Sequence, residues 1–160
     1  RALLSLKSND FPIYYLSPRG VKLDAQISNS ISKSDGMTLV CGKYEGVDER
    51  VIKHYNMIEI SIGDYILSGG DLAAMVLIDS VVRCLPNVLG NPLTLNEESF
   101  TNHLLEYPLY TQPREWKNYK VPDVLLSGDH KKIKNWKIKQ SEDITMKRRP
   151  DLWKKYLKLK

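Results

Sequence analysis

The 160-residue sequence is poor in cysteine, phenylalanine and histidine, and it lacks any long run of apolar residues. Cys41 and Cys84 have no CxxC spacing, which argues against a disulfide framework or a thiolate zinc site and favours a reducing, cytoplasmic location. The longest apolar stretch, 72–78, ends at Asp79 and is too short to cross a bilayer. Since no signal-peptide pattern is present either, we expect no membrane partner.

Charge is distributed unevenly along a chain of otherwise ordinary globular composition. Hydrophobic residues make up 42% of it and charged residues 27%, which excludes a disordered or collagen-like chain. Residues 1–113 carry 9 Lys+Arg against 13 Asp+Glu, whereas residues 114–160 carry 15 against 6. A basic tail of this kind indicates a polyanionic partner, most often a nucleic acid, although a solvated lysine-rich helical surface would have the same composition.

Strand and helix signals alternate in the first half, which predicts an α/β fold with a mainly parallel sheet. Short apolar or alternating segments indicate three strands, at 13–16, 38–41 and 57–62. Helices are indicated at 48–55 and 71–84. The second helix is apolar nearly all round, so we expect it to be buried against the sheet and a second subunit.

The later part of the chain differs in character. Residues 91–97 lack periodicity and are expected to form a loop, with a helical segment beginning near Glu98. A short strand is predicted at 124–127, before helical sequence over 129–160. We therefore expect a core over 1–112, a linker at 113–122 that two prolines bracket, and a basic helical domain over 123–160.

Three loops rich in glycine and proline each follow a predicted strand, at 16–20, 41–46 and 62–70. Ligands of open α/β sheets bind beyond the carboxyl ends of the strands, and glycine lets the backbone approach a ligand closely. None of the loops matches the GxGxxG pattern or the phosphate-binding loop, so a dinucleotide or nucleoside triphosphate site is not supported. Each loop taken alone is equally consistent with a turn that needs glycine for its geometry.

Segments spread over nearly the whole chain resemble the bacterial tRNA guanine-N1 methyltransferases, the TrmD family of the SPOUT class. The matching segments are YLSPRG (15–20), LVCGKYEGVDERVI (39–52), SIGDYILSGGDLAAMVLIDSVVR (61–83), VLGN (88–91), EESF (97–100), YPLYTQP (107–113) and LLSGDHKKIKNWK (125–137). They occur in the family's order and with matching spacings. The resemblance also implies that the family's first strand and a glycine-rich segment precede Arg1.

The resemblance implies a fold, a reaction and an assembly. The fold is an α/β domain with a deep trefoil knot, one of the rare exceptions to the rule against knotted chains, followed by a small helical domain. The reaction transfers a methyl group from S-adenosylmethionine to N1 of the guanine immediately 3′ of the anticodon in tRNA. The functional unit is a homodimer with each active site at the subunit interface.

The cofactor pocket implied by the resemblance is made from the three loops. Their backbone amides and carbonyls would read the adenine edge while apolar side chains pack on its faces. A ligand without phosphates also suits loops that lack a phosphate-binding pattern. The positions are Tyr15, Leu16, Ser17, Pro18, Gly42, Tyr44, Glu45, Gly46, Ser61, Ile62, Gly63, Tyr65, Leu67, Gly69 and Gly70. The alternative is that the apolar members are core residues and the glycines only form turns.

The chemical step requires a base for the guanine N1 proton and a group that stabilises charge on the neighbouring carbonyl oxygen. By resemblance these are Glu98, where the family has an aspartate, and Arg83 at the end of the long helix. Glu97 is the alternative base. Glu106 stands where the family carries an aspartate associated with activity or magnesium dependence, which makes magnesium a candidate second cofactor. The histidines lack metal-ligand spacing, so we predict no protein-bound metal.

The basic tail is expected to bind the phosphates of the anticodon stem. The residues expected to contact these phosphates are Lys131, Lys132, Arg148 and Arg149. Such contacts supply affinity for tRNA but do not read its base sequence. Trp136 and Trp153 are expected to pack within their own domain rather than stack on bases. Two other functions stay open: a knotted methyltransferase that modifies a ribose 2′-hydroxyl, and a non-catalytic RNA-binding module.

Overall fold

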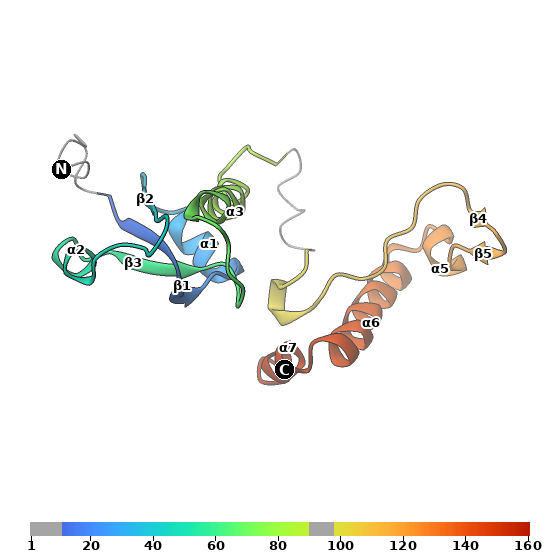
Figure 1. The fold of residues 1–160 in the computed structure, drawn as a ribbon. Helices are drawn as coiled ribbons and strands as arrows, with labels where there is room; N and C mark the ends of the chain where they lie inside the picture. Colours follow the sequence, from blue (N-terminus) through green and yellow to red (C-terminus); the bar gives the residue numbers. More distant parts are fainter. Residues whose placement is uncertain (1–10, 90–97) are drawn as a thin grey trace. The chain divides into compact units, whose positions relative to one another are not determined.

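The computed structural model describes residues 11–89 and 98–160 (Figure 1). Contacts divide the chain into a first unit, Arg1–Gly90, and a second unit, Asn91–Lys160, which are described separately. The loop expected over 91–97, with the alternative base Glu97, lies outside the described residues.

The first unit is built on a parallel three-stranded sheet, as predicted. Its strands are β1 (Ile13–Lys22), β2 (Thr38–Cys41) and β3 (Ile58–Ser61), in the order β2-β1-β3. Helix α1 (Ala25–Ile31) connects β1 to β2, α2 (Glu49–His54) connects β2 to β3, and α3 (Gly70–Val82) follows β3. The connection from β1 to β2 and the connection from β2 to β3 run in opposite directions across the sheet. Because connections between parallel strands share the same handedness, α1 and α2 lie on opposite faces of the sheet.

Alternating residues of the central strand β1 support a core on each face of the sheet. Tyr14 and Leu16 pack with α1 and α3, where Leu77 is completely buried. Tyr15 points to the other face and packs with Ile52 of α2 and with Met57. The sheet is therefore covered on both faces, as is usual for parallel strands.

Residues 17–20 differ from the expected turn. They remain within β1 as a bulge, because Leu16 and Val21 are both paired opposite Ile60 of β3. The bulge returns to the sheet at Gly20, where a Cβ atom would overlap the backbone of Glu59 and Ile60. Only glycine fits this close approach of two backbones.

Helix α3 confirms the apolar helix predicted at 71–84, with one face buried inside the first unit. Ala73, Ala74, Leu77 and Val81 lie on the core side. The opposite side is exposed and mostly apolar, although Asp79 also lies on it. Its large apolar residues are Leu72, Met75, Val76, Ile78 and Val82. The first unit by itself thus covers only half of this helix.

The second unit is mainly helical. Its elements are the 3-10 helix η2 (Thr101–His103), β4 (Glu115–Trp116), β5 (Tyr119–Lys120), α5 (Asp123–Leu126), α6 (His130–Arg148) and α7 (Pro150–Leu157). The strand predicted at 124–127 is wrong, since this segment forms α5, whose start carries the helix signals Pro122 and Asp123. The helix expected near Glu98 is a turn followed by η2. Residues 113–122 contain the β4–β5 hairpin, and their role as a domain boundary stays a prediction.

Polar side chains hold the second unit together internally. Thr145 of α6 is completely buried, donates to the carbonyl of Ser141 at 2.6 Å and accepts from the amide of Leu105 at 2.8 Å. Helix α7 is attached through Glu142, which accepts from Tyr156 and Lys160 at 2.7 Å each. The hydrogen bonds from Lys160 and then Tyr156 lower the pKa of Glu142.

Candidate functional site

The register of the sheet brings the three glycine-rich loops together. Leu16 is paired with Cys41 of β2 on one side and with Ile60 of β3 on the other. The bulge that follows Leu16 and the loops that follow β2 and β3 therefore lie at the same edge of the sheet. This is the carboxyl edge of β2 and β3, where open α/β sheets bind ligands.

One cavity of about 450 Å³ lies among these loops. Pockets for small organic ligands and cofactors are about 300–1,000 Å³ in volume. All fifteen positions expected from the resemblance to hold the cofactor line this cavity. The structure thus brings the whole set together, and its role in cofactor binding stays a prediction.

The cavity also has lining residues that were not among the expected positions. They are Arg19, Lys43, Val47, Glu49, Ile60, Ile66, Ser68 and Ala73. Four of the eight, Arg19, Lys43, Ile66 and Ser68, belong to the loops at 16–20, 41–46 and 62–70, so taking each loop as a whole would have found them. The signal for Arg19 and Glu49 is their opposite charge, since Arg19 lies in the β1 bulge and Glu49 begins α2.

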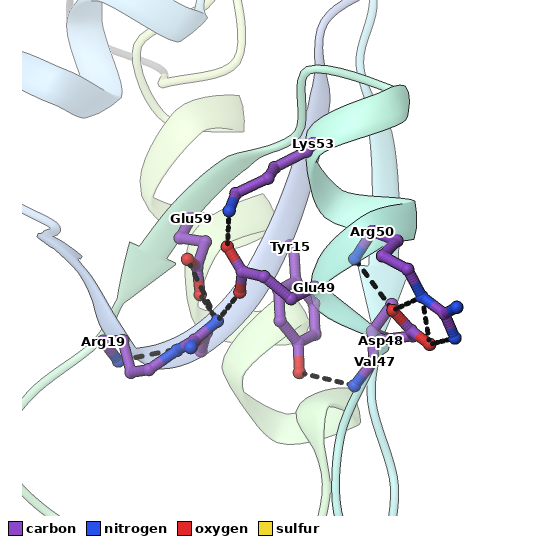
Figure 2. A network of polar contacts seen from close by, with 9 residues as sticks. Tyr15, Arg19, Val47, Asp48, Glu49, Arg50, Lys53 and Glu59 are labelled. Atoms are coloured by element: carbon purple, nitrogen blue, oxygen red, sulfur yellow. Dashed lines mark hydrogen bonds and ion pairs between the residues drawn. The ribbon is translucent and has the colours of Figure 1, made fainter.

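Tyr15 supports the loop that follows β2. Its hydroxyl accepts a hydrogen bond from the amide of Val47 at 3.3 Å (Figure 2). Its ring lies close to Gly42 and its hydroxyl close to Gly46. A Cβ atom at Gly46 would come within 2.9 Å of the Tyr15 hydroxyl, and the φ of Gly46 is +96°. Both the space and the backbone conformation at this position therefore require glycine.

The loop over 63–70 is fastened to the loop after β2 by a close contact at the start of α3. The amide of Gly70 donates to the carbonyl of Gly42 at 2.9 Å. A Cβ atom at Gly70 would lie 2.9 Å from the Cα atom of Cys41 and 3.1 Å from the amide nitrogen of Gly42. Since those neighbours are backbone, even an alanine at Gly70 would push the two loops apart.

Arg19 joins the bulge of β1 to α2 and β3 through ion pairs. One terminal guanidinium nitrogen lies 3.1 Å from Glu49 and 3.2 Å from Glu59, between the two carboxylates (Figure 2). The Arg19 amide also donates to the hydroxyl of Ser17 at 3.2 Å, inside the bulge. Since the Arg19 side chain is 62% exposed, these pairs add little to stability, but they tie the bulge to the rest of the cavity wall.

Helix α2 begins at a charged cap beside the cavity. Asp48 accepts hydrogen bonds from both the backbone amide of Arg50 at 2.8 Å and its guanidinium at 2.6 Å. The guanidinium and then the amide lower the pKa of Asp48, which therefore stays ionised at neutral pH. An ionised cap accepts the unsatisfied amides of the first turn.

Cys41 ends β2 next to the cavity. Partial desolvation and, secondarily, the charge of Asp71 raise the pKa of the Cys41 thiol above its usual value. At neutral pH the sulfur is therefore a protonated thiol, which is neither a good nucleophile nor a metal ligand.

The two residues expected to act on guanine belong to different units. Arg83 is the C-cap of α3 in the first unit, where its amide donates to the carbonyl of Asp79 at 3.1 Å. Glu98 lies in the second unit and is partly exposed. Each is described within its own unit, and their convergence on one substrate stays a prediction.

The segment that carries Glu98 is a tight loop with unusual backbone. Phe100, Asn102 and His103 have φ values of +78°, +51° and +62°, which residues other than glycine rarely adopt. The amide of Glu106 donates to the hydroxyl of Ser99 at 3.0 Å, so the two ends of the loop lie together. Such strain often accompanies functional sites, and here it brings Glu106 back beside the neighbour of Glu98.

The four basic residues expected to bind tRNA lie at opposite ends of α6. Lys131 and Arg148 are separated by about 25 Å along the helix axis at about 1.5 Å per residue. Lys132 forms an ion pair with Asp129 at 3.3 Å, and Arg149 pairs with Asp151 at 2.6 Å. The two ends therefore cannot contact one phosphate, and within each end one cation already has an acidic neighbour.

Among residues 11–89 and 98–160, no group of three or more His, Cys, Asp or Glu side chains is arranged to hold a metal ion. Within the same part of the chain, no helix has the length and apolar character needed to traverse a bilayer.

Comparisons with known proteins agree on one family. A sequence model described as "tRNA (Guanine-1)-methyltransferase TrmD" matches residues 1–155. Proteins named "tRNA (guanine-N(1)-)-methyltransferase" are similar to the chain: that of Pelagibacter ubique is 58% identical over 91% of it, and that of Rhodospirillum rubrum 53% over 92%. The chain spans 64% and 62% of the lengths of these two relatives, which is less than two thirds. The chain therefore belongs to the tRNA (Guanine-1)-methyltransferase TrmD family.

Proposed function

We propose that this chain is part of an enzyme that transfers a methyl group from S-adenosylmethionine to N1 of the guanine immediately 3′ of the anticodon in tRNA. The observation that carries the proposal is the cavity at the edge of the sheet, which three separate loops line in a chain of this family. A tRNA substrate would also place the enzyme in the cytoplasm.

The cavity fits S-adenosylmethionine in size and chemistry. Its walls combine backbone amides and carbonyls of glycine-rich loops with apolar side chains, including Leu16, Ile62 and Leu67. Such a lining suits an adenine ring and an aliphatic chain, neither of which needs a phosphate-binding site. When bound, S-adenosylmethionine supplies a methyl group on a positively charged sulfur, which is an electrophile. We place this cavity in the trefoil knot that the SPOUT class carries.

The chain's own residues perform the acid–base and electrostatic work on the guanine. The Glu98 carboxylate accepts the proton from N1, which makes that nitrogen nucleophilic. The Arg83 guanidinium stabilises the negative charge that develops on the neighbouring carbonyl oxygen. The longer side chain of Glu98, compared with the family's aspartate, changes the reach of the base and not its chemistry. Magnesium, in the region of Glu106, is the additional cofactor we propose to test.

A homodimer is the assembly that this function requires. The exposed side of α3 supports it, since Leu72, Met75 and Val76 are 57%, 64% and 47% exposed in the single chain. An exposed helix face that is mostly apolar is usually covered by protein. The proposed active site lies at that interface, with Arg83 at the end of the same helix.

The second unit supplies the affinity for tRNA in this proposal. The residues over 123–160 form its basic helical domain, the residues over 113–122 link it to the core over 1–112, and the basic residues at the two ends of α6 contact separate phosphates. Such contacts position the RNA without reading its sequence, which falls to the cavity that accepts the guanine.

Transfer of label from tritiated S-adenosylmethionine to undermodified tRNA tests the reaction, and nuclease digestion with mass spectrometry locates the methylated atom. We expect the label on guanine N1. Glu98→Gln should lower turnover by about 100-fold or more while tRNA affinity is unchanged, because a general base contributes about that much. Glu98→Asp is the matched control, since it restores the family's residue and should keep activity.

Two outcomes would replace the proposal. Label on a ribose 2′-oxygen would make the chain another kind of knotted methyltransferase. Normal tRNA binding without any transfer by the unaltered protein would make it an RNA-binding module. The names of the relatives specify guanine N1 and so favour neither alternative.

A further inference from the structure

The β4–β5 hairpin of the second unit presents two aromatic rings to solvent. Trp116 is 59% exposed and Tyr119 is 75% exposed, although large aromatic side chains usually bury most of their surface. The rings are stacked, with centroids 6.5 Å apart and an angle of 27° between their planes. None of the roles assigned above uses this pair.

The backbone of the hairpin holds the rings in place. Trp116 and Tyr119 are directly paired across β4 and β5, on either side of a two-residue turn. The turn residues Lys117 and Asn118 have φ values of +46° and +67°, as in a type I′ turn. The amide of Val121 donates to the carbonyl of Arg114 at 2.9 Å and closes the base of the hairpin. The aromatic pair is therefore a preformed surface.

The hairpin carries positive charge close to the aromatic pair. The Lys117 ammonium lies 5.0 Å from the centroid of the Trp116 ring. Arg114 and Lys120 flank the rings in sequence, and Glu115, the acidic residue within 114–120, forms an ion pair with Lys120 at 3.7 Å. Exposed aromatic rings combined with cations match the two parts of an unpaired nucleotide, the flat base and the phosphate.

The other two tryptophans differ from Trp116. Trp136 is half-buried, and its ring is tilted by 56° against Tyr110. Trp153 is also half-buried and is tilted by 33° against Tyr156. Both tryptophans pack within the second unit, as expected, whereas no role was expected for Trp116 from the sequence.

We propose that the hairpin over 114–120 is a second RNA-contact site, on which unpaired bases of the tRNA substrate stack against Trp116 and Tyr119. The site rests on the proposed function for the identity of its RNA. It is separate from the basic ends of α6, because it recognises exposed bases, whereas those residues contact phosphates.

Binding measurements on the full chain test this site with two RNA probes, a 12-nucleotide single strand and a paired duplex of the same length, followed by fluorescence anisotropy. The Trp116→Ala/Tyr119→Ala variant should weaken single-strand binding about fivefold or more, because each stacked base contributes about that much. Duplex binding should stay within twofold, since paired bases are not available to stack. The slope of affinity against salt should not change, because no charge is removed.

Matched variants separate stacking from other effects. Trp116→Phe/Tyr119→Phe keeps two rings and should bind the single strand within twofold of the unaltered chain. Leu109→Ala removes another exposed apolar side chain, 68% exposed, of the second unit and should have no effect. Equal loss for single strand and duplex, or no loss for either, would overturn the site.

Sedimentation of the same variants identifies a protein occupant. If Trp116→Ala/Tyr119→Ala changes the oligomeric state and leaves single-strand binding intact, the hairpin is a protein contact and the RNA site is wrong. The methyl-transfer assay is independent of these outcomes. A hairpin that binds single strands in a chain without transferase activity would overturn the proposed reaction and leave this site standing.

Discussion

The two units of the chain differ in what they bury and in the charge that they carry. Of the described residues, the buried apolar ones lie almost entirely in the first unit, and Leu152 is the exception. The second unit buries Ser141 and Thr145 as well, and it carries 15 Lys+Arg against 8 Asp+Glu over 98–160. Over 11–89 the balance is 7 against 9. Packing thus fixes the shape of a cavity in the first unit, whereas charge and exposed rings define the surface of the second.

The largest effect is expected from the core of the first unit. Leu77 is completely buried, so Leu77→Ala should lower the free energy of unfolding by about 3–5 kcal/mol through lost packing and a cavity. Leu152→Ala in the second unit should cost about 2–3 kcal/mol at the low end of the same range, since its surroundings are more polar. Urea denaturation followed by circular dichroism measures both.

Val21→Ala is the control for this pair. Val21 is 65% exposed, and its truncation should change the free energy of unfolding by less than about 0.5 kcal/mol. Equal losses for Leu77 and Leu152 would mean that the units do not differ in the way their cores are built.

A smaller effect distinguishes two kinds of glycine. Gly70→Ala would force apart the loops that line the cavity, and overpacking of this kind costs about 1–3 kcal/mol. If the ligand binds only when the loops are together, the same free energy lowers the affinity for S-adenosylhomocysteine by about 5- to 150-fold. Gly128→Ala in the second unit meets no atom within 4 Å but has a φ of +70°. It should lower stability by about 1–2 kcal/mol and leave the affinity unchanged.

Isothermal calorimetry with S-adenosylhomocysteine and thermal unfolding together measure both glycine variants. If Gly128→Ala lowers the affinity for S-adenosylhomocysteine as much as Gly70→Ala does, the comparison is wrong, because the cavity would then depend on the second unit.

Salt dependence tests whether the basic surface of the second unit binds RNA. Each phosphate contact contributes about 0.7–0.9 to the slope of log affinity against log salt concentration. Lys131→Ala should lower the slope for tRNA by about that amount, and Lys132→Ala by less, because Lys132 is paired with Asp129. Lys33→Ala, an exposed lysine of the first unit, should not change it. Equal changes for all three lysines would place the RNA contact elsewhere.

The smallest effect concerns the Arg149–Asp151 pair. Hydrogen bonds from the Arg149 guanidinium lower the pKa of Asp151 from 3.8 to about 2. A carboxyl with a lowered pKa stabilises the folded state above its unfolded pKa, and this contribution disappears as the pH falls from about 4 to about 2. Arg149→Gln should return the pKa toward 3.8, as NMR titration of the carboxyl would show. A pKa that stays near 2 in that variant would assign the shift to the backbone of α7.

The sequence predicts well what depends on local pattern. β2 and α3 follow directly from apolar periodicity, and the three loops follow from glycine and proline placed after strands. Two features depend on partners far away in the sequence and were not predictable. The β1 bulge forms because Leu16 and Val21 both pair with Ile60 of β3. The exposure of Trp116 depends on whether other elements of the second unit pack over its ring.

Helix α1 was missed for a different reason. Its sequence, AQISNSI, is rich in serine and β-branched residues, which have low helix propensity. The available signal was Asp24, which accepts a hydrogen bond from the amide of Ile27 at 2.9 Å as the N-cap. Position 98 shows a similar limit, since the three left-handed residues that follow it shape a strained loop where acidic sequence suggested a helix.

In the bulge over 17–20 the length of the segment is independent of the alignment of β1 with β3, whereas in a regular strand the two are coupled. In an unbroken ladder, inserting or deleting one residue turns every later side chain to the opposite face. Here the ladder stops at Leu16 and resumes at Val21 opposite the same residue of β3. A change in the length of this bulge would therefore reshape this wall of the cavity while the sheet on either side keeps its alignment.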